Sequence, residues 1–164
     1  MKDTSVVRLL DLTRPDELIM GQKDFQQFTL VAAMIRQLKL PCQLVVAATV
    51  REDDGLAMSS RNRHLNADER HRALCIHRSL KKAAEMIASG ERSASNISEA
   101  VGRVLAEGSP DKIDYVSVVR YGDLQPVDGI SPKSVLAIAA FFGSTRLIDN
   151  MIMEERGEKF ACIY

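Results

Sequence analysis

The fold of this chain changes character at Gly55-Leu56-Ala57-Met58-Ser59-Ser60-Arg61-Asn62. An apolar run at residues 44–50, rich in valine, precedes the segment and predicts a buried strand, whereas residues 66–90 follow it with a helical pattern. Strand-to-helix junctions are where α/β proteins usually bind their ligands. Two hydroxyls followed by a guanidinium offer hydrogen-bond donors to phosphate oxygens. A surface loop whose serines cap the next helix is an equally good interpretation of this segment alone.

The residues before this segment alternate between helical and strand-like patterns. Apolar residues recur at helical spacing in residues 5–12 and 23–38, and short apolar runs occupy residues 17–20 and 43–48. The order helix, strand, helix, strand is typical of a parallel α/β sheet. Two strands and two helices cannot cover both faces and edges of such a sheet, so we expect this part to be the end of a larger domain.

The residues after the segment follow a different rhythm. Asn66 is a candidate N-cap for one helix over residues 66–90, and a second helix is predicted over residues 95–106. Strand-like runs then follow at residues 113–120, 134–142 and 145–152, and Gly143-Ser144 predicts a tight antiparallel hairpin. The charged residues 154–159 predict a solvated turn. The pattern indicates an α+β domain with two helices and about three antiparallel strands, and it places a domain boundary between residues 49 and 50.

Composition excludes several classes of protein. The 22 basic and 22 acidic residues balance, which argues against nucleic acid or an anionic membrane as a bulk partner. The three cysteines are widely spaced with no Cys-x-x-Cys pair, so we expect neither a disulfide framework nor a structural metal site. No apolar run reaches the ~18 residues that a membrane span needs, and no signal peptide is recognised. The cytoplasm is the expected location.

A second donor-rich junction lies at Gly21-Gln22-Lys23-Asp24-Phe25-Gln26-Gln27. It also follows a predicted strand and opens a predicted helix, whose N-terminus favours an anion. Gly21 would permit close backbone approach, Lys23 would pair with a phosphate, and Asp24 would accept from a hydroxyl or cap the helix. The alternative is an ordinary helix start with an incidental lysine. Because adjacent parallel strands end at one edge of a sheet, two such junctions on successive strands strengthen the ligand-binding interpretation.

The two junctions carry a specific resemblance. Together with Leu40-Pro41, Val50-Arg51-Glu52 and residues 145–150 (Thr-Arg-Leu-Ile-Asp-Asn), they resemble the pantothenate synthetase (pantoate–β-alanine ligase) family in order along nearly the whole chain. The resemblance implies an ATP-dependent ligase that forms pantoyl adenylate and then transfers the pantoyl group to β-alanine. It also implies a Rossmann-like N-terminal domain, a smaller C-terminal lid domain, a homodimeric parent enzyme, and Mg²⁺ held mainly by the phosphates.

The resemblance assigns roles to residues of both junctions. Lys23 would bind an ATP phosphate as a catalytic residue, Gly21 and Asp24 would line the adenosine pocket, and Gln27 would hydrogen-bond pantoate. Adenylate formation develops charge on the departing pyrophosphate, so fixed cations there would contribute most of the catalysis.

The remaining predicted site residues lie in the central segment. Met58, Ser59, Ser60 and Arg61 would form the phosphate-gripping loop, with Val50 beside the adenine. Ser59, Ser60 and Arg61 are the predicted catalytic residues of this loop, which resembles in role the Lys-Met-Ser-Lys-Ser loop of class I aminoacyl-tRNA synthetases. Closure of the lid would exclude water from the reactive acyl adenylate.

The chain also departs from the family pattern. The family's first half carries a His-x-Gly-His motif that binds ATP, whereas the histidines here are His64, His71 and His77, outside any such motif. His71 and His77 are six residues apart and so do not share a helix face, which favours structural roles over metal binding. We therefore expect a C-terminal portion of the enzyme, residues 1–49 from the catalytic domain and residues 50–164 as the lid, that is inactive alone.

Two alternatives of other classes remain open from the sequence. One is a non-catalytic interaction or structural module. Under either interpretation, exposed strand edges at residues 17–20 or 43–48 are expected to promote disorder, self-association or strand exchange. The other is a small RNA-binding domain that uses arginines 51, 61, 63, 70 and 72. Zero net charge and low aromatic content disfavour the RNA-binding alternative, because few side chains are available to stack on bases.

Overall fold

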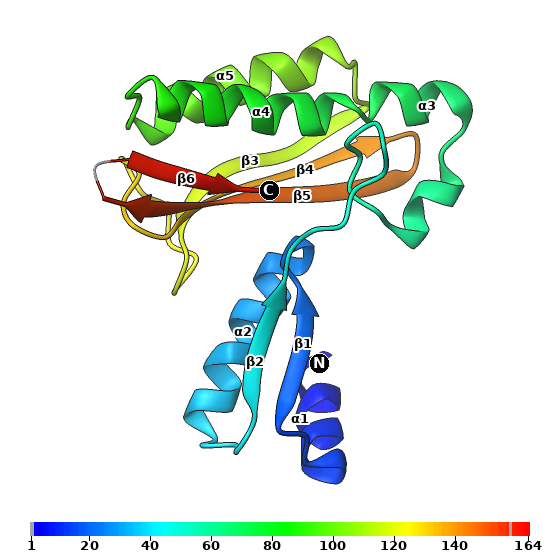
Figure 1. The fold of residues 1–164 in the computed structure, drawn as a ribbon. Coiled ribbons are helices and arrows are strands. Elements are labelled where there is room, and N and C mark those ends of the chain that lie inside the picture. Colours follow the sequence, from blue (N-terminus) through cyan, green and yellow to red (C-terminus); the bar gives the residue numbers. More distant parts are fainter. Residues whose placement is uncertain (1, 158) are drawn as a thin grey trace. The chain divides into compact units, whose positions relative to one another are not determined.

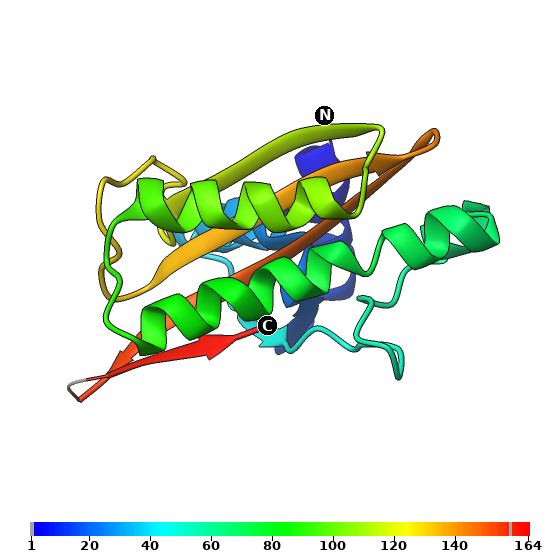
Figure 2. The same ribbon diagram turned by 90° about the horizontal axis from the view of Figure 1, so that it is seen from above.

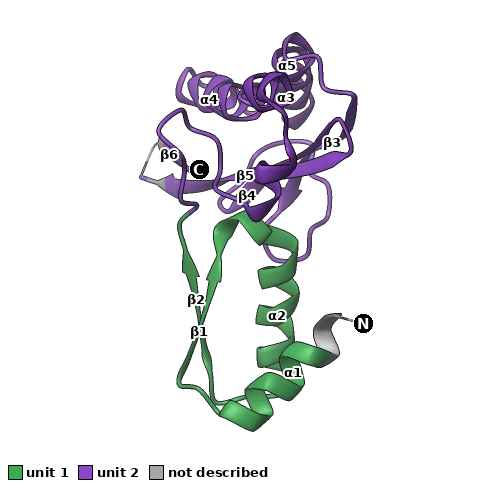
Figure 3. Cartoon of the chain, turned by 90° about the vertical axis from the view of Figure 1, so that its right-hand side faces the viewer, with its two compact units in different colours: residues 1–48 green, residues 49–164 purple. Residues whose placement is uncertain are grey.

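The computed structural model describes residues 2–157 and 159–164, and they form two compact units. Unit 1 comprises Met1–Ala48 and unit 2 comprises Thr49–Tyr164 (Figure 3). The change of unit falls directly before the hairpin that leads into the Ser59-Ser60-Arg61 segment.

Unit 1 is built around a two-stranded parallel sheet. Strands β1 (Glu17–Gly21) and β2 (Gln43–Ala47) pair in register from Glu17 opposite Gln43 to Gly21 opposite Ala47. Between them the chain forms the short 3-10 turn η1 (Gln22–Asp24) and helix α2 (Phe25–Gln37), and helix α1 (Lys2–Thr13) precedes β1. The predicted helix, strand, helix, strand order and its parallel pairing are confirmed, with ends shifted by up to three residues.

The core of unit 1 is small. Phe25 and Phe28 of α2 are buried and meet edge to face with ring centroids 5.2 Å apart. Val31 on the same helix and Leu10 of α1 are also buried. These positions follow the three- and four-residue spacing that predicted an amphipathic α2.

Unit 2 packs helices against one four-stranded antiparallel sheet. Helices α4 (Cys75–Ala88) and α5 (Ala94–Glu107) lie side by side across one face of the sheet (Figures 1 and 2). The strands lie in the order β3 (Lys112–Arg120), β4 (Ser134–Phe142), β5 (Thr145–Arg156) and β6 (Lys159–Ile163). Strand β4 is central and almost wholly buried, as its uninterrupted apolar sequence predicts. Phe142 pairs with Thr145, which confirms the two-residue hairpin turn at Gly143-Ser144.

The predicted single helix over residues 66–90 is wrong, because the chain forms two helices there. Helix α3 (Ala67–Arg72) begins at Asn66, whose side chain and that of Glu69 form a reciprocal capping box, so the predicted N-cap is confirmed. At Ala73 and Leu74 the backbone tightens, with the Leu74 N–H bonded to the carbonyl of His71 three residues earlier. Gly108 lies against this bend, since a Cβ there would approach the Arg72 carbonyl oxygen to 2.9 Å.

The predicted solvated turn at residues 154–159 is also wrong in part, because a fourth strand extends the sheet. Strand β5 continues to Arg156, and β6 returns along it with Cys162 opposite Met153. Phe160, Cys162 and Tyr164 pack against the core of unit 2 at alternate positions. This alternation of apolar residues is typical of a strand. The charged residues before it led to the prediction of a solvated turn in place of the β5–β6 hairpin.

Candidate functional site

In unit 1 the predicted site residues gather at the carboxyl end of β1. Gly21 ends the strand, Lys23 and Asp24 lie in η1, and Gln27 lies in the first turn of α2; Asp24 and Gln27 are exposed. Gly21 has an extended backbone, φ −74°, so no left-handed conformation requires glycine there. A Cβ added at Gly21 would meet no atom within 4 Å, which leaves the backbone open to a ligand. Asp24 makes no capping hydrogen bond to α2, so that proposed role is wrong.

In unit 2 the central segment is a hairpin followed by a short 3-10 turn. The N–H of Met58 donates to the carbonyl of Val50 at 2.9 Å, and the N–H of Glu52 donates to the carbonyl of Leu56 at 2.8 Å. Gly55 forms the tip with φ 93°, and a Cβ there would lie 2.2 Å from Cδ2 of His77. Glycine is therefore required at residue 55 both by the backbone conformation and by the imidazole.

The hairpin places two exposed apolar side chains next to the hydrogen-bond donors of the following residues. Val50 and Met58 are 66% and 55% exposed, and they are the large hydrophobic side chains that unit 2 exposes within the described residues. Ser59 caps the turn η2 (Ser60–His64), since its Oγ accepts from the N–H of Arg61 at 3.2 Å. Ser60 and Arg61 follow with exposed side chains. Of the two sequence interpretations, serine capping is confirmed in part, because Ser59 caps η2 while Asn66 caps the next helix. Phosphate binding by the exposed groups stays a prediction.

A buried ion pair anchors this hairpin to the sheet. The guanidinium of Arg51 donates to both carboxylate oxygens of Asp149 on β5, at 2.7 and 3.1 Å, and also to the carbonyl of Gly55 at 3.1 Å. Asp149 lies opposite Ile138 on the sheet, and its side chain is only 2% exposed. A carboxylate so deeply buried is costly unless it is paired, and the bidentate hydrogen bonds from Arg51 supply that pairing.

His77 lies under the hairpin tip. Burial, followed by the nearby Arg51 charge, lowers the pKa of the His77 imidazole below its ordinary value. Its ring lies 5.8 Å from that of Tyr164, and its Nδ1 is buried without a hydrogen-bond partner among the described residues. The sequence assigned a structural role to His77, and the packing against Gly55 gives that role a specific form.

The arginines proposed for RNA binding are largely committed to carboxylates. Arg51 pairs with Asp149, Arg70 pairs with Glu52 and Asp54 at 2.8 and 2.6 Å, and Arg72 pairs with Asp68 at 2.8 Å. Internal pairing of these guanidinium groups disfavours the RNA-binding alternative.

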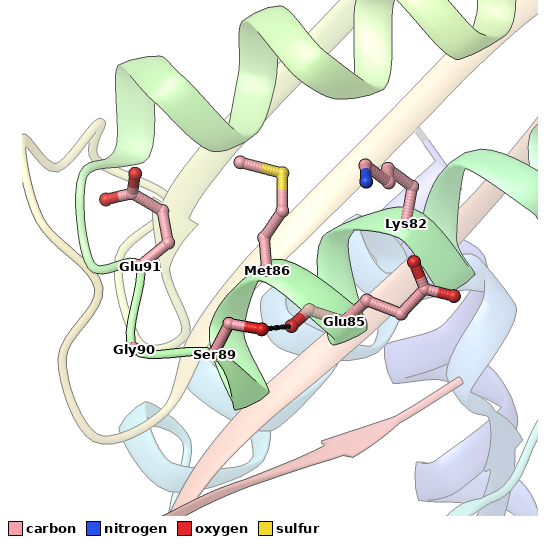
Figure 4. A pocket seen from close by; sticks show the side chains of 6 residues that line it. All are labelled: Lys82, Glu85, Met86, Ser89, Gly90 and Glu91. Carbon is pink, nitrogen blue, oxygen red and sulfur yellow. Dashed lines mark hydrogen bonds between the residues drawn. The ribbon is translucent and has the colours of Figure 1, made fainter.

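A surface pocket of about 550 Å³ lies elsewhere in unit 2, at the end of α4 (Figure 4). Of the side chains that line it, Ser89 donates to the carbonyl of Glu85 at 2.9 Å. Glu91 accepts from the N–H groups of Arg92 and Ser93 at 2.8 and 2.7 Å. These polar groups serve the helix ends, and the pocket contains none of the predicted site residues.

The part of the chain that the structure describes contains neither a metal-binding cluster nor a membrane-spanning helix. No group of three or more His, Cys, Asp or Glu side chains is placed to hold a metal ion. No helix in residues 2–157 and 159–164 has the length and apolarity needed to cross a bilayer.

Comparison with known proteins identifies the family. The sequence model of the family described as pantoate–β-alanine ligase matches residues 3–152. The pantothenate synthetase of Caldicellulosiruptor saccharolyticus is 40% identical over 151 residues, which cover 92% of this chain and 54% of that protein. The enzyme of Pseudothermotoga lettingae is 43% identical over 152 residues, with 93% and 54% covered. The chain thus spans about half the length of these curated relatives.

Solved structures agree with the sequence relatives. The crystal structure of pantothenate synthetase from Thermus thermophilus superposes with a TM-score of 0.86 at 34% identity, over 91% of this chain and 54% of that one. The pantoate–β-alanine ligase of Francisella tularensis, solved with β-γ ATP and β-alanine, shares the fold with a TM-score of 0.62 at 22% identity, over 91% and 48%. This chain belongs to the pantoate–β-alanine ligase family.

Proposed function

We propose that this chain forms the C-terminal part of an ATP-dependent ligase that condenses pantoate with β-alanine through a pantoyl adenylate. Family membership over residues 3–152 supports the overall reaction. Residues 1–49 would supply the last βα units of a Rossmann-like catalytic domain, and residues 50–164 would supply the lid. The parallel pairing of β1 with β2 and the separate core of unit 2 support this division.

One observation carries the proposal for the lid. Exposed Val50 and Met58 lie across the hairpin from each other, and the exposed donors of Ser60 and Arg61 follow directly. ATP presents the same sequence of chemical groups, with an apolar adenine face at one end and anionic phosphates at the other. Val50 and Met58 would contact the base, while Ser59, Ser60 and Arg61 would hold the phosphates.

The junction in unit 1 would contribute the second half of the phosphate contacts. Lys23 would neutralise charge on the departing pyrophosphate, Gly21 and Asp24 would line the adenosine pocket, and Gln27 would orient pantoate. Lys23 lies directly before the N-terminus of the 13-residue helix α2, where the helix dipole also favours an anion. Fixed cations of this kind stabilise the transition state of an in-line displacement at the α-phosphorus.

Magnesium would arrive with the nucleotide. As the family resemblance implies, the phosphates of ATP would supply most of its ligands. Bound Mg²⁺ would neutralise phosphate charge. Arg61 and Lys23 would act directly on phosphate oxygens as hydrogen-bond donors.

The test joins residues 1–164 to the part of a relative that they do not match. Residues 1–164 replace the matching half of the Thermus thermophilus enzyme, and pantoate-dependent pyrophosphate release is measured. We expect activity in the hybrid, a loss of at least about 100-fold in its Arg61→Ala variant, and no activity from the 164 residues alone. A folded hybrid without activity would refute the proposed function, and activity of residues 1–164 alone would refute their expected inactivity.

We also propose that the working enzyme is a homodimer. The family resemblance supports this assembly, and sedimentation of the active hybrid tests it. A single species with the mass of two chains is the expected result, whereas an active monomer would contradict it.

A further inference from the structure

Glu52 joins three parts of unit 2 through one carboxylate. Its Oε1 accepts from the side-chain amide of Asn62 at 2.7 Å, and its Oε2 accepts from the guanidinium of Arg70 on α3 at 2.8 Å. The Glu52 backbone also belongs to the hairpin, since its carbonyl accepts from the N–H of Gly55 at 2.8 Å. Hairpin, phosphate-gripping loop and α3 are thus tied together at this residue.

Asn62 closes the loop that carries the exposed donors. Besides Glu52, its side-chain amide reaches the carbonyl of Ala57 at 3.2 Å, and its backbone N–H donates to the carbonyl of Ser59 at 3.0 Å. Both side-chain partners are acceptors, which fixes the amide with its nitrogen toward them. Residues 58–61 therefore project from a loop whose two ends are held together by one side chain.

The negative charge of Glu52 needs an explanation so close to a proposed phosphate site. A carboxylate near a phosphate site opposes anion binding, unless its charge is offset and its hydrogen bonds serve another purpose. Arg70 pairs with both Glu52 and Asp54, at 2.8 and 2.6 Å, and its single positive charge offsets part of theirs. The bond from Asn62, and next that from Arg70, lowers the pKa of the Glu52 carboxyl, so the acceptor stays ionised at neutral pH.

We propose that Glu52 and Asn62 are positioning residues, which hold the Met58–Arg61 loop in the shape that receives the phosphates of the nucleotide. This inference rests on the proposed function of that loop. Neither residue contacts the nucleotide in this scheme. Both act through the backbone of residues 57–62, and Arg70 fixes Glu52 in turn.

The experiment uses the full 164-residue chain and two readouts. Amide hydrogen exchange at residues 58–61 reports loop order without ligand, and titration with Mg–ATP and with inorganic pyrophosphate reports affinity. For Asn62→Ala and Glu52→Ala we expect faster exchange at these amides, and affinity weaker by about 10- to 100-fold, as for the outer partners that orient ligands in metal sites. Glu52→Gln keeps a carbonyl acceptor for Asn62 and should retain more affinity than Glu52→Ala.

Asp114→Ala is the matched control. Its carboxylate is 28% exposed, against 36% for Glu52, and it pairs with Arg146 at 2.9 Å elsewhere in unit 2. Its removal should leave loop exchange and affinity within about twofold of the wild type, because a surface ion pair contributes only ~0–1 kcal/mol.

The outcomes separate the two proposals. Unchanged exchange at residues 58–61 in Asn62→Ala, or equal losses in Asp114→Ala, would overturn the positioning role. A wild-type chain that binds neither Mg–ATP nor pyrophosphate would instead overturn the proposed role of the loop in phosphate binding, and the exchange data would still decide whether Glu52 and Asn62 order it.

Discussion

The two compact units of this chain differ in how far they bury their apolar side chains. In unit 2 a single cluster of buried residues extends from Leu56 to Met153 and includes residues of α4, α5 and the sheet. Unit 1 has fewer than a third of the residues, yet five of the seven large hydrophobic side chains that the described residues expose belong to it: Leu9, Leu12, Ile19, Leu30 and Leu38. Unit 2 therefore has a core of its own, whereas unit 1 leaves much of its apolar surface uncovered.

This difference indicates which unit is autonomous. A two-stranded sheet with one covering layer is marginally stable in water, while four strands under two helices provide a complete core. The same contrast fits the comparison with relatives, which continue for about as many residues again as this chain matches. The uncovered surface of unit 1 is what a portion of a larger α/β domain is expected to show.

The strongest test of the contrast is to separate the units. We expect residues 49–164 alone to unfold cooperatively with nearly the midpoint of the whole chain, and residues 1–48 alone to lack a cooperative transition, a loss of all folded structure. Far-UV circular dichroism with thermal denaturation measures both. A cooperative transition in the isolated residues 1–48 would contradict the assignment of autonomy to unit 2.

The next test asks how far unit 2 depends on its buried ion pair. Asp149→Ala would leave the Arg51 guanidinium, 13% exposed, without its carboxylate, and we expect a cost of about 3–5 kcal/mol in the free energy of unfolding. Asp114→Ala removes a partly exposed pair and should cost about 0–1 kcal/mol. Urea denaturation followed by tyrosine fluorescence suits this comparison, because all three tyrosines lie in unit 2. Equal losses of unfolding free energy in the two variants would show that the Arg51–Asp149 pair stabilises unit 2 no more than a surface ion pair does.

Two leucines sharpen the comparison of cores. Leu136 on β4 is fully buried, and Leu136→Ala should cost about 2–5 kcal/mol through lost burial and a cavity. Leu12 on α1 is 73% exposed, and Leu12→Ala should stay within about 0.5 kcal/mol. Denaturant unfolding of the whole chain measures both variants. A large cost for Leu12→Ala would mean that its face is covered in solution.

The smallest expected effect is a pH dependence confined to unit 2. Because the pKa of His77 is lowered in the folded state, the unfolded state binds the proton more readily, and stability should fall as pH drops below about 6.5. Melting temperatures measured from neutral to mildly acidic pH should decline less in His77→Gln than in the wild type. His71→Gln, at an exposed position of α3, is the control and should keep the wild-type slope. Identical slopes in all three proteins would exclude His77 as the source.

Local sequence patterns predicted most elements of the fold. The spacing of Phe28 and Val31 predicted α2, the apolar run of β4 predicted a strand, and Asn66 predicted the start of α3. These signals depend on neighbours within one or two turns. The break at Ala73–Leu74 was not predicted, because it depends on packing against the distant residue Gly108. Strand β6 was not predicted, because the charged residues before it obscured the alternation of Phe160, Cys162 and Tyr164.

The candidate site divides in the same way. The sequence by itself determined the order of the groups, since Met58, Ser60 and Arg61 lie within one four-residue motif, and all three side chains are exposed. Only the tertiary structure decided what holds them. Arg51 and Asp149 are 98 positions apart, and Glu52 reaches Arg70 and Asn62 across a turn and a helix. No periodicity relates such pairs, because ion pairs form between residues that the completed fold brings within hydrogen-bond distance.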